Sequence, residues 1–95
     1  MKRAMAENDT LEIERKRLLW RATHRGIKEM DILFGGFALR NLANMAADDL
    51  VEFAALLELP DQDVLYWVTH KDVVPVGLQS PLLSAILAYR PEPVA

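Results

Sequence analysis

The sequence of 95 residues contains no cysteine and only two histidines, His24 and His70. The absence of cysteine excludes a disulfide scaffold, thiol catalysis and a thiolate metal site. A structural zinc site would then depend on carboxylates at unsuitable positions. Both histidines instead stand near the predicted ends of helices, where a positive charge is favourable. We therefore expect no bound metal and a chain that is stabilised by packing alone.

Motifs of catalysis and cofactor binding are equally scarce. The two serines, Ser80 and Ser84, lie outside any nucleophile-elbow sequence, and the four glycines form neither a phosphate loop nor a dinucleotide fingerprint. Acidic pairs at residues 48–49 and 61–63 fall in the first turns of predicted helices, where carboxylates are stabilising without any catalytic role. We predict that the chain is not an enzyme and that it binds no cofactor stably.

The sequence also lacks the run of about 20 apolar residues that a helix needs to span a bilayer. Residues 1–9 contain no apolar segment of the kind found in secretory signals, and Glu7 and Asp9 argue against a transit peptide. We expect a soluble, cytoplasmic protein without membrane insertion.

Hydrophobic residues make up 52% of the chain, and they recur at spacings of three and four without any strand pattern. This periodicity predicts the all-α class, with a compact five-helix bundle in a single domain. The predicted domain covers residues 10–90, between a flexible N-terminal tail at residues 1–9 and a C-terminal tail at residues 91–95. Helices are predicted over residues 10–23, 27–41, 47–58, 61–70 and 81–90.

Capping residues define the predicted helix ends. We expect Asp9 or Thr10 to cap the first helix, Asp61 to cap the fourth, and Ser80 to cap the fifth. Residues 71–79 are predicted to form an ordered loop, because its apolar side chains would be costly to leave in water. These side chains belong to Val73, Val74, Val76 and Leu78.

Two features have both a structural and a functional interpretation. Trp20 lies opposite the core face of the first helix, so either a later segment covers it or a partner binds it. Gly35-Gly36 interrupts the second helix, which indicates a kink, a close approach of another surface, or a locally weak helix.

The segment Arg25-Gly26-Ile27-Lys28-Glu29 lies where the first helical pattern ends and the second begins. Arg25 and Glu29 have the i,i+4 spacing of an ordinary ion pair. However, arginine before glutamate is the less favourable order for such a pair, and Gly26 is predicted to break the helix between them. From the residues alone, both a simple helix joint and an outward-facing binding site remain open.

Charge is distributed unevenly along the chain. Residues 1–25 contain seven Lys/Arg and four Asp/Glu, whereas residues 41–95 contain two and eight. The basic part is small and mixed with acids, so it is a weak nucleic-acid footprint. A helical nucleic-acid-binding domain is nevertheless one alternative function, and a regulatory adaptor with an unrelated client is another. The first would use Arg15, Lys16, Arg17, Arg21 and Arg25.

The segment at residues 25–29 is preceded by a basic and aromatic run, Arg15-Lys16-Arg17-Leu18-Leu19-Trp20-Arg21. The segment then continues as Arg25-Gly26-Ile27-Lys28-Glu29-Met30-Asp31-Ile32-Leu33-Phe34-Gly35. Phe53, Pro60-Asp61-Gln62-Asp63 and Trp67 follow in register. Over about residues 12–70, this combination resembles the family of succinate dehydrogenase flavinylation factors, whose signature is Arg-Gly-x-x-Glu followed closely by Asp.

The resemblance implies a five-helix assembly factor that binds the flavoprotein subunit of succinate dehydrogenase, and sometimes of fumarate reductase, and promotes covalent attachment of FAD to it. The bond forms on the client, so the factor would act through orientation and preorganised electrostatics. The resemblance further implies a monomer when free, no nucleic-acid partner, and a location in the bacterial cytoplasm or the mitochondrial matrix.

The same resemblance assigns the partner-binding residues. Arg25, Gly26 and Glu29 would be the client-facing signature, with both charges kept outward for the client. Asp31 either belongs to this surface or ties the first two helices together through Arg21 or a backbone amide. The full expected set is Trp20, Arg21, Arg25, Gly26, Glu29 and Asp31.

Overall fold

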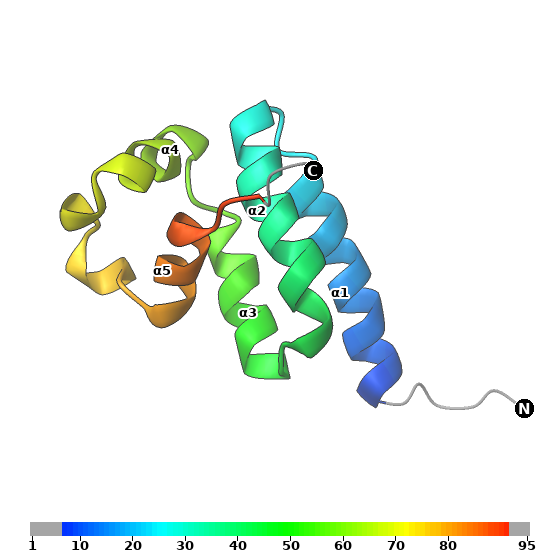
Figure 1. Ribbon diagram of the computed structural model, residues 1–95. Helices are drawn as coiled ribbons and strands as arrows, with labels where there is room; N and C mark the ends of the chain where they lie inside the picture. Colours follow the sequence, from blue (N-terminus) through cyan, green and yellow to red (C-terminus); the bar gives the residue numbers. More distant parts are fainter. Residues whose placement is uncertain (1–6, 92–95) are drawn as a thin grey trace, which may run out of the picture.

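The computed structural model describes residues 7–91, and these residues form helices and turns without any strand (Figure 1). The five α-helices are α1 (Glu7–Thr23), α2 (Lys28–Asn41), α3 (Ala47–Leu56), α4 (Asp61–Thr69) and α5 (Pro81–Ala88). Three short 3-10 helices connect them: η1 (Leu42–Asn44), η2 (Lys71–Val73) and η3 (Val76–Leu78). The predicted all-α fold with five helices is confirmed. None of the described helices combines the length and the apolarity that a membrane crossing requires.

The helices pack around one hydrophobic core. Helix α1 packs against α2 and α3, while α5 packs against α2, α3 and α4. Phe34 and Phe53 lie at the centre with no exposed surface, and their rings meet edge to face at 6.2 Å. Helix α2 contributes one face to this core through its buried residues, which include Met30, Phe34, Phe37 and Ala38.

The double glycine of α2 is explained by close contacts on two sides of the helix. A Cβ atom on Gly35 would lie 2.9 Å from the Thr23 side chain and 3.3 Å from the Ala22 carbonyl oxygen of α1. A Cβ atom on Gly36 would lie 2.6 Å from the hydroxyl of Tyr89. Of the interpretations left open, the close approach of other surfaces is therefore the correct one.

Two of the predicted helix caps are wrong and one is confirmed. Helix α1 begins at Glu7, inside the predicted tail, so Asp9 and Thr10 lie within the helix and do not cap it. Asp61 is the first residue of α4 and does not cap this helix, because its carboxylate accepts a hydrogen bond from Arg25 instead. Ser80 caps α5 as predicted, since its hydroxyl accepts the Leu83 N–H at 3.1 Å. Residues 1–6 and 92–95, the remainder of the predicted tails, lie outside the described residues.

The connection between α4 and α5 is ordered, but less apolar surface is buried there than predicted. Val74 is only 6% exposed, and its carbonyl accepts a hydrogen bond from the Gln79 side chain. Val73, Val76 and Leu78, in contrast, are exposed. The prediction that burial of all four apolar side chains orders this connection is therefore wrong, because the 3-10 turns leave three of the four exposed.

Candidate functional site

The corner between α1 and α2, residues 24–27, depends on a backbone conformation that favours glycine. Gly26 has a φ of +94°, and nothing lies within 4 Å of the position that a Cβ atom would take. The glycine is therefore required by its dihedral angle and not by crowding. Asp31 fastens the corner from α2, because its carboxylate accepts the Arg25 N–H at 2.6 Å. The structure contains the tie through a backbone amide that was considered for Asp31.

The Arg25 side chain points into the molecule. Its Nε and Nη2 atoms lie 2.7 and 2.5 Å from Oδ1 of Asp61. Nη1 donates to the Leu57 carbonyl at 2.6 Å, and Nη2 to the Leu59 carbonyl at 3.0 Å. The guanidinium also lies 4.6 Å from the centre of the Phe34 ring, and the side chain is only 9% exposed. Arg25 thus joins the corner to the turn between α3 and α4.

Two interpretations of Arg25 are therefore wrong. It does not pair with Glu29, and it does not hold its charge outward for a partner. The physical reason lies at the end of α3, where the last carbonyl groups of a helix have no intrahelical donor. The five-donor fork of arginine satisfies two carbonyls of this turn and a carboxylate at once, which no other side chain can do.

Glu29 faces outward, as expected. It lies in the first turn of α2 and is exposed, and among the described residues no hydrogen bond or ion pair reaches its carboxylate. It also lines an apolar hollow of about 260 Å³ between α2, α4 and the segment after α5. The two charges of the signature thus have different surroundings: the arginine is enclosed and the glutamate is accessible.

Trp20 and Arg21 lie on the outside of α1, close to the corner. Trp20 is 62% exposed, and its ring stacks on His24 with the ring centres 4.2 Å apart. The interpretation in which a later loop or helix covers Trp20 is therefore wrong. Arg21 forms an ion pair with Glu58, just after α3. The structure brings Arg25 and Asp31 together, while Trp20 and Arg21 each have a separate neighbour.

The end of α4 repeats the arrangement of Trp20. There Tyr66 stacks on His70 at 3.9 Å, and the His70 Nδ1 atom lies 3.1 Å from the Tyr66 carbonyl oxygen. His24 contacts the Trp20 carbonyl oxygen in the same way at 2.8 Å. Both histidines therefore lie against the last carbonyl groups of a helix, in agreement with their predicted positions.

The basic residues of α1 are largely engaged within the protein. Arg15 donates to the carbonyls of Leu42 and Met45 at 3.0 and 2.7 Å, which ties α1 to the connection after α2. Arg17 pairs with Glu14, and Arg21 and Arg25 are paired as well, so four of the five cations considered for nucleic-acid binding have internal partners. This arrangement argues against a phosphate-binding face.

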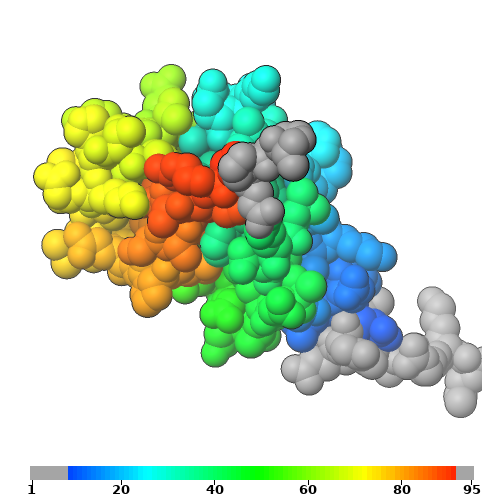
Figure 2. Space-filling view, in the orientation of Figure 1, coloured from blue at the N-terminus to red at the C-terminus, as the bar shows by residue number. Residues whose placement is uncertain are grey.

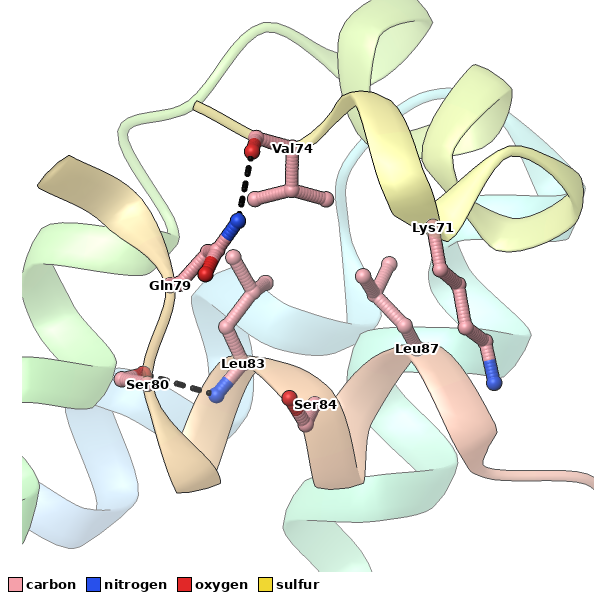
Figure 3. A pocket seen from close by; sticks show the side chains of 7 residues that line it. All are labelled: Lys71, Val74, Gln79, Ser80, Leu83, Ser84 and Leu87. Carbon is pink, nitrogen blue, oxygen red and sulfur yellow. Dashed lines mark hydrogen bonds between the residues drawn. The ribbon is translucent and has the colours of Figure 1, made fainter. Parts of the chain in front are cut away.

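A second hollow, of about 250 Å³, lies beside α5 (Figure 3). Two of its polar side chains are already used, because Ser80 caps α5 and Gln79 donates to the Val74 carbonyl. No histidine or carboxylate lines it, so it contains no acid–base pair. Within residues 7–91, moreover, no three His, Asp or Glu side chains are placed to hold a metal ion.

The role of Asp61, which holds Arg25 at the site, was not predicted, because Asp61 was considered as a helix cap. The role of Arg15, which ties α1 to the connection after α2, was not predicted either, because Arg15 was considered as a phosphate-binding residue. The signal for Asp61 was present, since the run Pro60-Asp61-Gln62-Asp63 is part of the family resemblance. Its pairing with Arg25 spans 36 residues of sequence, and local patterns contain no information about such a contact.

The fold and the site together define a small helical protein. Its most distinctive feature is the exposed surface around Glu29, beside an α1–α2 corner that internal hydrogen bonds hold in one conformation. A family model described as flavinator of succinate dehydrogenase matches residues 16–90. The chain therefore belongs to this family of succinate dehydrogenase assembly factors. Because the relatives are named as assembly factors, the prediction that the chain is not an enzyme is confirmed.

Several curated proteins are similar to the chain. The FAD assembly factor SdhE of Acetobacter pasteurianus is 39% identical over 75 residues, which cover 79% of this chain and 69% of that protein. The mitochondrial succinate dehydrogenase assembly factor 2 of Candida glabrata is 42% identical over 62 residues, covering 65% of this chain and 40% of that protein. Its counterpart in Dictyostelium discoideum is 35% identical over 81 residues, covering 83% and 57%. The chain thus spans about half the length of these mitochondrial relatives.

Proposed function

We propose that this chain binds the flavoprotein subunit of succinate dehydrogenase and promotes the covalent attachment of FAD to it. Family membership supports this proposal, as do relatives named for FAD assembly and for assembly of succinate dehydrogenase. FAD belongs to the client in this scheme, so the chain itself holds no cofactor stably. The proposal includes fumarate reductase as a further client, a monomeric free state, and the bacterial cytoplasm or the mitochondrial matrix as the location.

The exposed carboxylate of Glu29 is the single observation that favours this function most. Charged groups without an internal partner are available for charge-assisted hydrogen bonds to a client. We assign the client surface to Gly26, Glu29, Trp20 and Arg21, which lie at or near the corner. Arg25 and Asp31 hold the corner in its conformation, and they therefore affect client binding indirectly.

Complementation tests the proposal. In a strain that lacks its own factor, the wild-type chain should restore flavin that stays on the client flavoprotein after denaturation. The Glu29→Ala variant should restore much less, although its unfolding midpoint should stay close to that of the wild type because the side chain is exposed. Lys28→Ala, which alters an exposed neighbour in the same turn, is the matched control and should retain activity.

Two results would contradict this assignment. If the wild-type chain leaves the client without covalent flavin, the proposed function is wrong. If Glu29→Ala flavinylates the client as well as Lys28→Ala does, the function stands and Glu29 is not part of the client surface.

A further inference from the structure

The apolar hollow beside Glu29 is a groove with three walls. Helix α2 provides one wall with Ile32 and Leu33, and α4 provides the second with Leu65 and Val68. The third is the segment after α5, which includes Pro91. Figure 2 shows this segment, in red, just below the yellow-green α4 and the start of α2 in cyan. The groove is therefore built from three parts of the chain that the core already holds in place.

Two of the apolar side chains in this groove remain substantially exposed. Ile32 is 42% exposed and Leu65 is 40% exposed, on opposite walls. Burial of apolar surface contributes about 25 cal/mol per Å², so a side chain that filled the groove would add to binding on both walls. The groove has the chemistry of a pocket for one apolar anchor residue of a partner.

Charged residues at the rim of the groove favour particular residues next to that anchor in the bound segment. Glu29 lies on the α2 side, and Arg90 lies on the side of the third wall. Hydrogen bonds from Nη1 of Arg90 to the carbonyls of Leu87 and Tyr89 hold that guanidinium in place, at 3.0 and 2.7 Å. A bound segment would therefore be favoured when it places a cation beside Glu29, because opposite charges across an interface fix its register.

We propose that this groove binds an extended segment of the flavoprotein client, with an apolar side chain between Ile32 and Leu65 and a lysine or arginine beside Glu29. This inference rests on the proposed function and extends it, because it makes the signature glutamate the charged edge of a peptide groove. The occupant is a client segment because Glu29, which we assign to the client surface, is itself a lining residue.

A second copy of this chain fits the groove poorly. An isologous dimer places the same patch against itself, so two hollows would face each other and stay unfilled. Specific interfaces also bury about 800 Å² on each partner, which a groove with two half-exposed apolar side chains does not supply by itself. A narrow client segment that inserts a side chain fills the hollow, and the rest of the client surface at the corner adds to the buried area.

Binding to the purified apo-flavoprotein of succinate dehydrogenase tests the groove. Leu65→Glu places a charge in the apolar hollow and should weaken binding by at least about tenfold. Val51→Glu is the matched control, because Val51 is 71% exposed on α3 and lies outside the groove, and it should change the affinity by less than about twofold. Circular dichroism should show similar melting of both variants.

A crosslinking experiment identifies the occupant. A photoreactive phenylalanine analogue at position 65 should crosslink to one client segment that contains an apolar residue close to a lysine or arginine. The same analogue at position 51 should give no such product. Charge reversal at the rim, Glu29→Lys, should weaken binding, and reversal of the crosslinked client cation to glutamate should restore part of it.

Each remaining outcome overturns the proposal in a recognisable way. If the wild type binds and Leu65→Glu binds equally well, the groove is not used and the proposed function survives. If the wild type does not bind the flavoprotein at all, the proposed function fails and the groove assignment fails with it. If the free chain sediments as a dimer that Leu65→Glu dissociates, the occupant is a second copy. NMR contacts between Leu65 and Val94 in the free chain would make the occupant its own C-terminal segment.

Discussion

Two arginine–carboxylate pairs connect the region around the α1–α2 corner with the turn between α3 and α4, and they differ mainly in burial. In the outer pair, Arg21 meets Glu58, with side chains that are 34% and 75% exposed. In the inner pair, Arg25 meets Asp61, with side chains that are 9% and 21% exposed. The arginines are only four residues apart in the sequence, but Arg21 lies in the last turn of α1 with a solvated contact, whereas Arg25 lies in the corner with an enclosed one.

The difference shows why the same chemistry has different consequences at the two positions. An exposed pair gains little, because water screens the attraction and both side chains lose conformational freedom. An enclosed charge must keep every partner, since the loss of one leaves the other without solvation. Arg25 also satisfies two backbone carbonyls, which the outer arginine does not. The inner pair therefore fixes the conformation of the corner, and the outer pair contributes little to its stability.

The largest effect should come from removing the inner arginine. Arg25→Ala should lower the free energy of unfolding by about 3 to 5 kcal/mol, because Asp61 and two carbonyls lose their donor. Arg21→Ala should lower it by less than about 1 kcal/mol. Urea denaturation of both variants measures the difference. Equal losses for the two variants would contradict the distinction between the inner and outer pairs.

A smaller loss is expected when the corner loses its carboxylate tie. Asp31→Ala removes the acceptor of the Arg25 N–H and should cost about 1.5 to 3 kcal/mol, the range for hydrogen bonds to charged groups. Asp31→Asn keeps an acceptor oxygen and should recover part of this loss. If the two variants have the same urea midpoint, the hydrogen bond does not account for the effect of Asp31.

Substitution of the corner glycine should lower the free energy of unfolding by a smaller amount again. Gly26→Ala forces a side chain into a φ of +94° and should cost about 1 to 2 kcal/mol. Gly77→Ala is the control, because the added Cβ atom has open space and no such φ is found there. It should be neutral or stabilise the protein by about 0.4 to 1 kcal/mol. Equal effects in thermal denaturation would show that conformational strain does not distinguish the two glycines.

The sequence was sufficient for those features that depend on local periodicity. The apolar spacing identified the five helices, and the Ser80-Pro81 pair marked the start of α5. Even the corner glycine was identified, because its function is a local dihedral angle. Helix caps were less predictable, since Asp61 had a stronger partner in Arg25 than its own helix offered.

The orientation of the signature charges was beyond the reach of local patterns. Arg25 and Glu29 stand four residues apart and look equivalent in sequence, yet α3 and α4 enclose only the first. Deciding this requires contacts across 32 to 36 residues, to Leu57 and Asp61. The family resemblance grouped the two residues, but it did not separate the residue that builds the corner from the one that faces outward.

The smallest effect should belong to the outer pair, where a double-mutant cycle isolates the interaction itself. With Arg21→Ala, Glu58→Ala and the double variant, the coupling free energy should be about 0.2 to 1 kcal/mol, as for other exposed pairs. Raising the ionic strength to about 1 M shortens the Debye length to about 3 Å and should remove most of this coupling. The inner pair should retain most of its coupling under the same conditions, because water and salt have little access to it. A coupling in the outer pair that is large and insensitive to salt would mean that burial does not set the strength of these two contacts.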